Sequence, residues 1–275
     1  MNGESEQPVS VPVASAEPVE RGLHRALSIV RSTYHWLVSA AFFFPVCSFL
    51  ILLGIFVDPR KNDGAQRTFC RIVMKLAGAK LVVQRAPGFD PQRTCFFIVN
   101  HVNLFDPFVL YATIPQFLRG LELESHFRIP VYGWMMKRFG NVPVPGINRP
   151  SDLKRMWRLT RAALDSGVSL AVFPEGQRTL NGRMGPFKDG VFRMALQFGT
   201  PIVPVSVVGA FAFNKKTSWL LRPGTVTVVL HNVIETKDLH KADFPALRDR
   251  VHAIISRPME EGLDAPEIAD LSRQP

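Results

Sequence analysis

Residues 94–106 read TCFFIVNHVNLFD, and this stretch decides the expected fold. The run 94–99 is almost wholly apolar, as in a strand buried on both faces. Asp106-Pro107 is typical of a helix start, with the aspartate as N-cap and the proline at the first helical position. A buried strand that leads into a helix indicates an α/β domain. Open α/β sheets place their chemistry at the carboxyl ends of strands, where His101 falls.

The same arrangement recurs further along the chain. Residues 168–173 form a second apolar run that leads directly into the polar cluster PEGQRT at 174–179. Two polar clusters at strand carboxyl ends can face one cleft. The pattern predicts further strands at 80–84, 202–208 and 225–230, and helices at 66–77, 151–166, 187–198 and 244–255. We therefore expect an α/β fold with a mixed, mostly parallel sheet flanked by helices.

An apolar segment precedes this domain. Residues 36–57 contain no charged side chain, and as a straight helix they would reach about 33 Å, enough to cross a bilayer. Pro45 lacks the N–H that a continuous helix uses, so a kinked span competes with a helical hairpin that dips into one leaflet. A buried core helix of a soluble protein is the third alternative. Basic residues flank both ends of the segment, which suits a hairpin with both ends on the cytoplasmic face.

Charge and cysteine content narrow the class of protein. The 275 residues carry a formal net charge of +10, which implies an anionic partner such as a membrane surface, an acidic substrate or nucleic acid. Three widely spaced cysteines form no CxxC pair, which indicates a reduced compartment and no metal site. No zinc spacing, Walker loop or GxGxxG follows a strand, so nothing points to a nucleotide or metal cofactor.

His101 and Asp106 lie five residues apart and are the minimum equipment for general-base chemistry. An imidazole titrates near neutrality and can take a proton from a hydroxyl if a partner fixes which ring nitrogen is free. Asp106 is a candidate partner. Taken alone, the spacing equally fits a loop histidine beside an aspartate that caps a helix.

Four motifs in order resemble those of the glycerolipid acyltransferases related to 1-acyl-sn-glycerol-3-phosphate acyltransferase. The first, NHxxxxD, reads NHVNLFD at 100–106. The third, FPEG followed by any residue, Arg and Ser or Thr, is matched at 173–179. The fourth, a short apolar strand around a proline, resembles 201–205, and a Lys-x-Gly at 188–190 also follows the third motif. The second motif is looser and ends at Arg149.

The second motif is also where this chain departs from the family. The family often has isoleucine-aspartate before its arginine, whereas residues 142–149 contain two prolines and no acid. The family also tends to carry lysines just upstream, where this chain has Glu124-Ser125-His126. The identity of the acyl acceptor therefore stays open between lysophosphatidic acid and another lysolipid, such as a lysophospholipid or lyso-aminolipid.

The resemblance implies a membrane-bound O-acyltransferase. It would move an acyl group from acyl-CoA or acyl carrier protein to the free hydroxyl of 1-acyl-sn-glycerol 3-phosphate, giving phosphatidic acid in phospholipid biosynthesis. His101 would be the catalytic base and Asp106 its orienter. A thioester is already activated and the motifs hold no suitable serine or cysteine, so direct transfer without an acyl-enzyme is the simpler mechanism. No cofactor is expected beyond the thioester co-substrate.

The resemblance also implies a set of substrate-binding residues: Arg149, Glu175, Gly176, Arg178, Thr179 and Lys188. Arg178 suits the phosphate of the acceptor, since a guanidinium binds phosphate oxygens bidentately. Glu175 would repel an anionic substrate, so we expect it to hold the arginine or a glycerol hydroxyl. Gly176 is expected to allow close backbone approach or a positive φ.

These observations predict the domain organisation. Residues 1–34 would form a disordered, basic N-terminal tail, 35–60 a membrane-embedded or membrane-dipping segment, 61–260 the acyltransferase domain, and 261–275 a C-terminal tail. The enzyme would lie at the inner or cytoplasmic face of a membrane, with its active site on the cytoplasmic side and an anionic membrane surface, rather than nucleic acid, as its partner. A non-enzymatic basic protein that binds membranes or nucleic acid is the alternative from another class.

Overall fold

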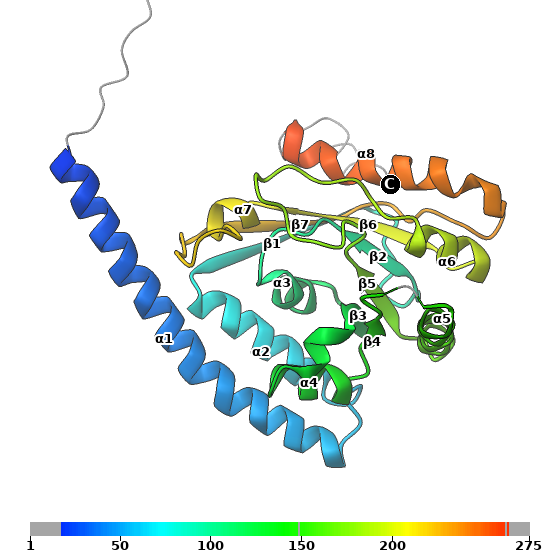
Figure 1. The fold of residues 1–275 in the computed structure, drawn as a ribbon, viewed down its shortest axis with the longest axis horizontal. Helices are drawn as coiled ribbons and strands as arrows, with labels where there is room; N and C mark the ends of the chain where they lie inside the picture. The colour runs from blue at the N-terminus through cyan, green and yellow to red at the C-terminus, as the bar shows by residue number, and fades with distance from the viewer. Residues whose placement is uncertain (1–17, 148, 262, 264–275) are drawn as a thin grey trace, which may run out of the picture.

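The computed structural model describes residues 18–147, 149–261 and 263, and its centre is a seven-stranded sheet (Figure 1). The strand order is β1-β7-β6-β2-β5-β3-β4. Only β6 and β7 pair antiparallel among these strands, which confirms a mixed, mostly parallel sheet. The strands are β1 (Ala79–Arg85), β2 (Phe96–Val99), β3 (Leu118–Leu123), β4 (Val142–Val144), β5 (Ser169–Val172), β6 (Ile202–Val208) and β7 (Gly224–Leu230).

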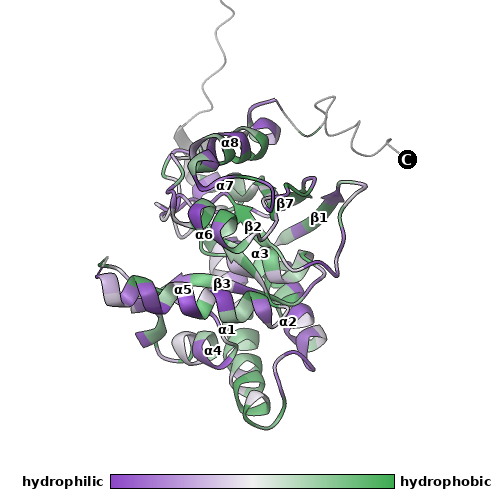
Figure 2. Cartoon of the chain, turned by 90° about the vertical axis from the view of Figure 1, so that its right-hand side faces the viewer, coloured by the Kyte–Doolittle hydropathy of each residue, from purple (hydrophilic) through white to green (hydrophobic). Residues whose placement is uncertain are grey.

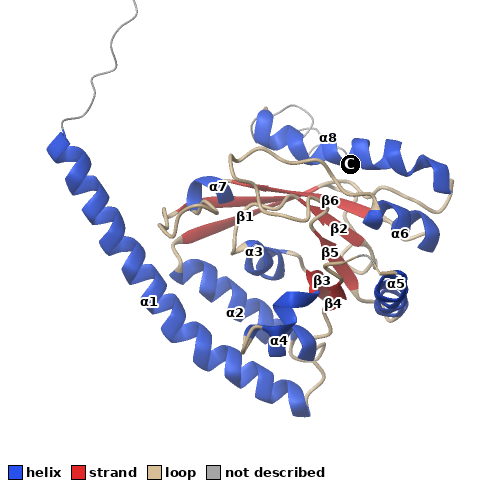
Figure 3. Ribbon diagram, viewed as in Figure 1, coloured by secondary structure: helices blue, strands red, loops and turns tan. Residues whose placement is uncertain are grey.

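Helices cover both faces of this sheet (Figure 3). They are α1 (Pro18–Phe56), α2 (Asp63–Leu76), α3 (Asp106–Thr113), α4 (Tyr132–Arg138), α5 (Pro150–Asp165), α6 (Gly190–Phe198), α7 (Ala210–Phe213) and α8 (Phe244–Glu260), with short 3-10 turns at η1 (Glu124–Arg128) and η2 (Lys241–Asp243). Helices α1 to α4 lie on one side of the sheet, and α5, α6 and α8 lie on the other (Figure 1).

Strand β2 shows why the core forms on both faces. All four of its residues are fully buried, and successive side chains point to opposite sides. Phe97 and Val99 pack in a cluster with α2 and α3, whereas Phe96 and Ile98 pack with α5, α6 and α8. Its neighbours β5 and β6 are also apolar except for one serine each. The continuous hydrophobic run therefore reflects a central strand buried from both sides.

Helix α1 corrects two expectations. It runs unbroken from Pro18 to Phe56. Residues 18–34 are therefore helical, and the prediction of a disordered tail is wrong for them. Pro18 stands at the first helical position, where the missing N–H costs nothing, and the run behind it contains no other proline before Pro45. The helix continues through Pro45, so the helical hairpin is wrong. Residues 1–17 of that tail, and the predicted C-terminal tail apart from residues 261 and 263, lie outside the described residues.

One face of α1 packs along the domain. Its buried side chains run from Ser32 to Leu50 and contact α2 and α4, with Phe42 stacked on Phe69 at a centroid distance of 5.8 Å. Much of the rest of the helix is apolar and exposed, and its C-terminal part is coloured hydrophobic in Figure 2. The large apolar side chains exposed between 36 and 57 are those of Leu37, Phe44, Phe49, Leu52, Ile55 and Phe56. By length and composition, the stretch 22–56 is sufficient to cross a membrane.

Candidate active site

The site begins where β2 ends, beside the carboxyl end of its parallel neighbour β5. Asn100 follows β2 and is buried. Its side-chain amide donates to Val207 O at 3.1 Å, and its side-chain oxygen accepts from Val207 N at 2.8 Å, so it continues the pairing of β2 with β6 by one residue. This bond pair fixes the direction in which the chain leaves the sheet and thus places His101.

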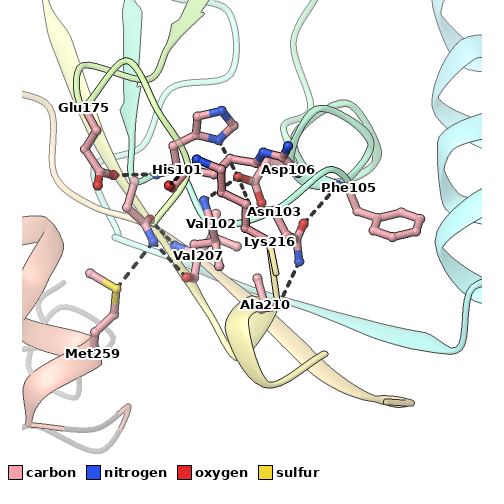
Figure 4. Close-up of polar contacts among 12 residues, drawn as sticks. His101, Val102, Asn103, Phe105, Asp106, Glu175, Val207, Ala210, Lys216 and Met259 are labelled. Atoms are coloured by element: carbon pink, nitrogen blue, oxygen red, sulfur yellow. Dashed lines mark hydrogen bonds and ion pairs between the residues drawn. The ribbon is translucent and has the colours of Figure 1, made fainter. Parts of the chain in front are cut away.

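His101 and Asp106 are in direct contact (Figure 4). His101 Nδ1 lies 2.8 Å from Asp106 Oδ2, and the same oxygen accepts from Val102 N at 2.6 Å and Asn103 N at 3.0 Å. Because a carboxylate only accepts, Nδ1 carries the hydrogen and Nε2 of the neutral ring has its lone pair free. Asp106 is fully buried, while the side chain of His101 is 22 % exposed. The pair therefore presents a basic nitrogen toward solvent.

Asp106 is not the N-cap that its sequence position suggested. Phe105 occupies the cap position, and Asp106 is the first residue of α3. Its carboxylate turns back toward the preceding loop, because the N–H groups of Val102 and Asn103 point at Oδ2.

The ring of Phe173 fixes the other side of the imidazole. The His101 and Phe173 ring centroids lie 4.3 Å apart with an interplanar angle of 21°, which is a stacked arrangement. Phe173 directly follows β5, so the sheet positions the histidine and its stacking partner from two adjacent strands. Phe173 was part of the quoted third motif, but its spacing gave no sign that it would contact His101.

Glu175 joins the two loops of the site. Its Oε1 accepts from His101 N at 2.6 Å and its Oε2 accepts from Gly185 N at 2.8 Å. Burial raises the pKa of this carboxyl, while the hydrogen bonds from Gly185 and His101 oppose the rise. Within the described part of the chain no ion pair joins Glu175 to Arg178, so the expectation that it holds the arginine is wrong. The carboxylate accepts hydrogen bonds from backbone N–H groups instead.

Gly176 and Lys188 lie against each other. Gly176 has a φ of +69°, and a Cβ there would come within 2.9 Å of Lys188 Cε. Lys188 is exposed, and its backbone N–H donates to Pro174 O at 2.9 Å. A side chain at position 176 would therefore strain the backbone and displace the lysine that crosses it.

Thr179 and Arg178 differ in what they contact. Thr179 N donates to His101 O at 2.9 Å, and its hydroxyl donates to Arg183 O at 2.7 Å, so Thr179 shapes the loop. Arg178 is partly exposed, and among the described residues its guanidinium has no hydrogen bond or ion pair. A cation next to the His101 loop is thus available to an anionic ligand.

Arg149 lies apart from these residues. It is exposed at the N-cap of α5, just after β4, and β3 and β4 separate it from β5 in the sheet. It lines a pocket of about 340 Å³ together with Leu123, Glu124, Ser125, Arg128, Pro145, Gly146, Ile147 and Asp152. The structure therefore brings His101, Asp106, Glu175, Gly176, Arg178, Thr179 and Lys188 together and places Arg149 in a neighbouring pocket.

No group of three or more histidine, cysteine, aspartate or glutamate side chains within the described ranges is arranged to hold a metal ion. The arrangement instead combines an oriented base, an unpaired guanidinium and a rigid loop. That combination suits proton abstraction from a hydroxyl on an anionic molecule.

Comparison with known proteins shows what the chain is similar to. Residues 80–208 match the family model described as Acyltransferase. The crystal structure of the 1-acyl-sn-glycerophosphate (LPA) acyltransferase from Thermotoga maritima has a TM-score of 0.73 and 21% sequence identity, and the alignment covers 88% of this chain and 98% of that one. At this identity the likeness shows the fold alone.

Two sequence relatives carry the same type of name. A chloroplastic 1-acyl-sn-glycerol-3-phosphate acyltransferase of Brassica napus is 34% identical over 51% of this chain and 40% of its own length. A 1-acyl-sn-glycerol-3-phosphate acyltransferase of Pseudomonas aeruginosa is 25% identical over 83% of this chain and 89% of its own length. The matches cover between 40% and 59% of the first three curated relatives, which also include proteins of Cocos nucifera and Chlamydomonas reinhardtii.

The fold, the strand-end site and the family model define an acyltransferase domain. The named relatives narrow this class, since those that the chain matches are 1-acyl-sn-glycerol-3-phosphate acyltransferases.

Proposed function

We propose that the protein is a membrane-associated 1-acyl-sn-glycerol-3-phosphate O-acyltransferase. The observation that carries this proposal is the 2.8 Å contact between His101 Nδ1 and Asp106 Oδ2 at the end of β2. That contact leaves Nε2 free as a base, and the neighbouring loop supplies an unpaired arginine for a phosphate. The names of the relatives supply the expected acceptor, 1-acyl-sn-glycerol 3-phosphate.

The acyl group is transferred directly to the acceptor, through a tetrahedral intermediate and without an acyl-enzyme. Nε2 of His101 takes the proton of the free glycerol hydroxyl as its oxygen attacks the thioester carbonyl. The tetrahedral intermediate then collapses, the carbon–sulfur bond breaks, and the leaving thiolate takes the proton from the imidazolium. Asp106 stabilises that imidazolium during the step, since its carboxylate is fixed by two backbone N–H groups.

The cysteines of the domain support a mechanism without an acyl-enzyme. Cys70 and Cys95 are buried, and burial raises the pKa of each thiol to about 12. A thiol that stays protonated near neutral pH is a poor nucleophile. The donor is then an acyl thioester of coenzyme A or of acyl carrier protein, and no further cofactor takes part.

Substrate binding follows from the loop after β5. The Arg178 guanidinium binds the phosphate of the acceptor, with Lys188 as a second cation over Gly176. Glu175 supports this loop through its bonds to His101 N and Gly185 N, and so acts on the substrate indirectly. Thr179 keeps the Arg178 backbone close to His101 through its bond to His101 O.

Helix α1 anchors the enzyme in one leaflet of a membrane. Its buried face is docked on the domain from Ser32 to Leu50, a length of about 27 Å at 1.5 Å per residue. A helix that crossed the bilayer would carry the attached domain into the hydrocarbon. Its outward apolar face instead suits an orientation in the plane of the surface, with the active site on the cytoplasmic side.

A second acceptor class has one observation in its favour. The pocket beside Arg149 carries the acids Glu124 and Asp152 as well as the cations Arg128 and Arg149. A zwitterionic headgroup matches such a mixed lining better than a plain phosphate does. Another lysolipid is therefore the competing acceptor.

The test is an assay of the purified full-length protein against a panel of lysolipids with both donor types. We expect the highest kcat/KM for 1-acyl-sn-glycerol 3-phosphate with one of the two thioesters. Higher kcat/KM for a zwitterionic lysolipid would favour the second acceptor class. Absence of acyl transfer to every lysolipid, from a folded preparation, would refute both.

A further inference from the structure

The segment at 209–223 lies beyond the residues that match the family model, yet it packs on both loops of the site. It connects β6 to β7 through α7. Asn103 Nδ2 donates to Ala210 O at 2.8 Å, which ties α7 to the His101 loop. The Phe105 and Phe213 rings also meet edge to face at 5.3 Å.

The same segment reaches the loop after β5. Phe211 lies against Gly182, where a Cβ would come within 2.9 Å of its ring. Gly182 has a φ of +84°, so the close approach and the backbone conformation both require glycine there. Residues 209–223 therefore contact the loops that carry His101 and Arg178.

The part of this segment at 214–223 is a folded turn, because hydrogen bonds cross it from the side chain at its start. Asn214 Nδ2 donates to Ser218 O at 3.0 Å and to Leu220 O at 3.3 Å. Helix α1 holds the outer side, since Trp36 Nε1 donates to Trp219 O at 2.8 Å and Leu221 N donates to Ser32 Oγ at 3.0 Å. The position of the turn is thus set by the rest of the fold.

This turn presents Lys216 to the site (Figure 4). Lys216 Nζ lies 3.4 Å from the backbone oxygen of Arg178. The side chain of Lys216 is exposed, and no carboxylate pairs with it among the described residues. The neighbouring Lys215 points elsewhere, with its Nζ 5.2 Å from the centroid of the Phe211 ring.

The ammonium group of Lys216 therefore lies beside the loop that carries Arg178, and neither side chain pairs with an anion among the described residues. The Arg178 guanidinium has no partner in the described structure, and an ammonium group approaches its backbone from another segment. A dianionic phosphate that binds at this loop can accept hydrogen bonds from both cationic side chains. Two independent parts of the fold hold this arrangement, because Thr179 fixes the Arg178 loop and α1 fixes the turn.

We propose that Lys216 binds the phosphate of the lysolipid acceptor together with Arg178. The inference rests on the proposed function and adds a binding residue from outside the four motifs.

The test compares Lys216→Ala with the matched control Lys215→Ala in the full-length protein. For Lys216→Ala we expect the KM for 1-acyl-sn-glycerol 3-phosphate to rise roughly tenfold, with kcat and the KM for acyl-CoA changed less than about twofold. Lys215→Ala should leave all three constants near the parent values. With a 1-acylglycerol, which has no phosphate, we expect neither substitution to change the rate of acylation.

Three results would overturn the inference. The acceptor KM of Lys216→Ala stays at the parent value, or the KM for acyl-CoA rises alone, which would assign the lysine to a donor phosphate. The third is that Lys216→Ala slows acylation of the acceptor without phosphate as much as it slows acylation of 1-acyl-sn-glycerol 3-phosphate. Binding of 1-acyl-sn-glycerol 3-phosphate, followed by tryptophan fluorescence, separates this inference from the function. If the parent protein binds 1-acyl-sn-glycerol 3-phosphate more tightly than Lys216→Ala does but transfers no acyl group, the proposed function is refuted and the Lys216 assignment stands.

Discussion

At the residue scale, the site depends on carboxylate side chains that accept hydrogen bonds from the backbone. Asp106 binds the N–H groups of Val102 and Asn103 as well as the imidazole, and Glu175 binds those of His101 and Gly185. Both carboxylates are buried, so each bond forms where water does not compete. The position of the His101 ring thus follows from two acids with different tasks.

Glu175→Gln tests the structural task. The amide of glutamine has one acceptor oxygen, so its NH₂ would face one of the two N–H groups and leave that group without an acceptor. We expect a loss of about 1–3 kcal/mol in the free energy of unfolding and a lower kcat. Thermal unfolding and steady-state kinetics measure both.

The matched control is Glu235→Gln, which weakens a surface pair. Glu235 bonds Arg93 at 2.5 Å, but the two side chains are 55% and 42% exposed, so the expected loss is under about 1 kcal/mol. Equal stability of the two variants would contradict the role given to Glu175.

At the element scale, α1 is both the proposed membrane anchor and a contact of the site. The helix packs on α2 and α4 and also bonds the turn that carries Lys216. An anchor that lies along the domain leaves the active-site loops at the level of the headgroups, where a lysolipid presents its free hydroxyl.

Cysteine labelling tests the orientation of α1. His24→Cys and Lys61→Cys place thiols beyond the two ends of the apolar stretch, and the native cysteines are all buried. In sealed vesicles we expect a membrane-impermeant maleimide to reach both new thiols from the same side. Labelling from opposite sides, with both thiols reactive in detergent, would show that the helix spans the bilayer.

The sequence predicted the elements that have a continuous apolar period. Strands β2, β5, β6 and β7 follow such runs and lie within two residues of the expected bounds. Strand β3 was missed because Arg119, Gly120 and Glu122 interrupt its pattern. In the fold, the Arg119 guanidinium is buried 3.8 Å from the Phe117 ring centroid and donates to Leu118 O, contacts that no local pattern encodes. Strand β4 has three residues and includes a proline, too little for a period.

Part of the site was also predictable. The motifs that contain His101, Asp106 and Arg178 follow strands, so these residues were expected at the edge of the sheet where strand carboxyl ends meet. Local sequence did not reveal that Asp106 lies inside α3, that Glu175 holds backbone, or that Arg149 lies beyond β3. Those facts depend on contacts between segments far apart in the chain, as does the approach of Lys216 to Arg178.

At the scale of the whole molecule, a buried histidine links the sheet to the last helix. His231 follows β7, and its Nε2 lies 2.8 Å from Ser206 Oγ, which donates to Ile255 O in α8. A hydroxyl has one hydrogen, so Nε2–H donates to Oγ. Burial, with a smaller contribution from Arg257, lowers the pKa of His231 to about 4.

This pKa predicts acid sensitivity of the fold. The unfolded histidine titrates near pH 6.5, so its lowered pKa gives stability that is present above pH 6.5 and is lost as pH falls from there to about 4. Between pH 7 and pH 5 we expect His231 to remove about 2 kcal/mol from the free energy of unfolding. Denaturant unfolding of the parent and of His231→Gln at both pH values measures this, with exposed His24→Gln as control. An equal pH dependence in all three would contradict it.

The central claim is that His101 is the base that accepts the proton of the acceptor hydroxyl. The most direct measurement is the kcat of purified His101→Ala with 1-acyl-sn-glycerol 3-phosphate and its acyl thioester. His126→Ala is the matched control, since His126 also pairs with a carboxylate, that of Glu122. We expect kcat to fall by about 100-fold or more in His101→Ala and to stay within about twofold of the parent in His126→Ala. A folded His101→Ala that transfers acyl groups as fast as the parent would contradict the claim.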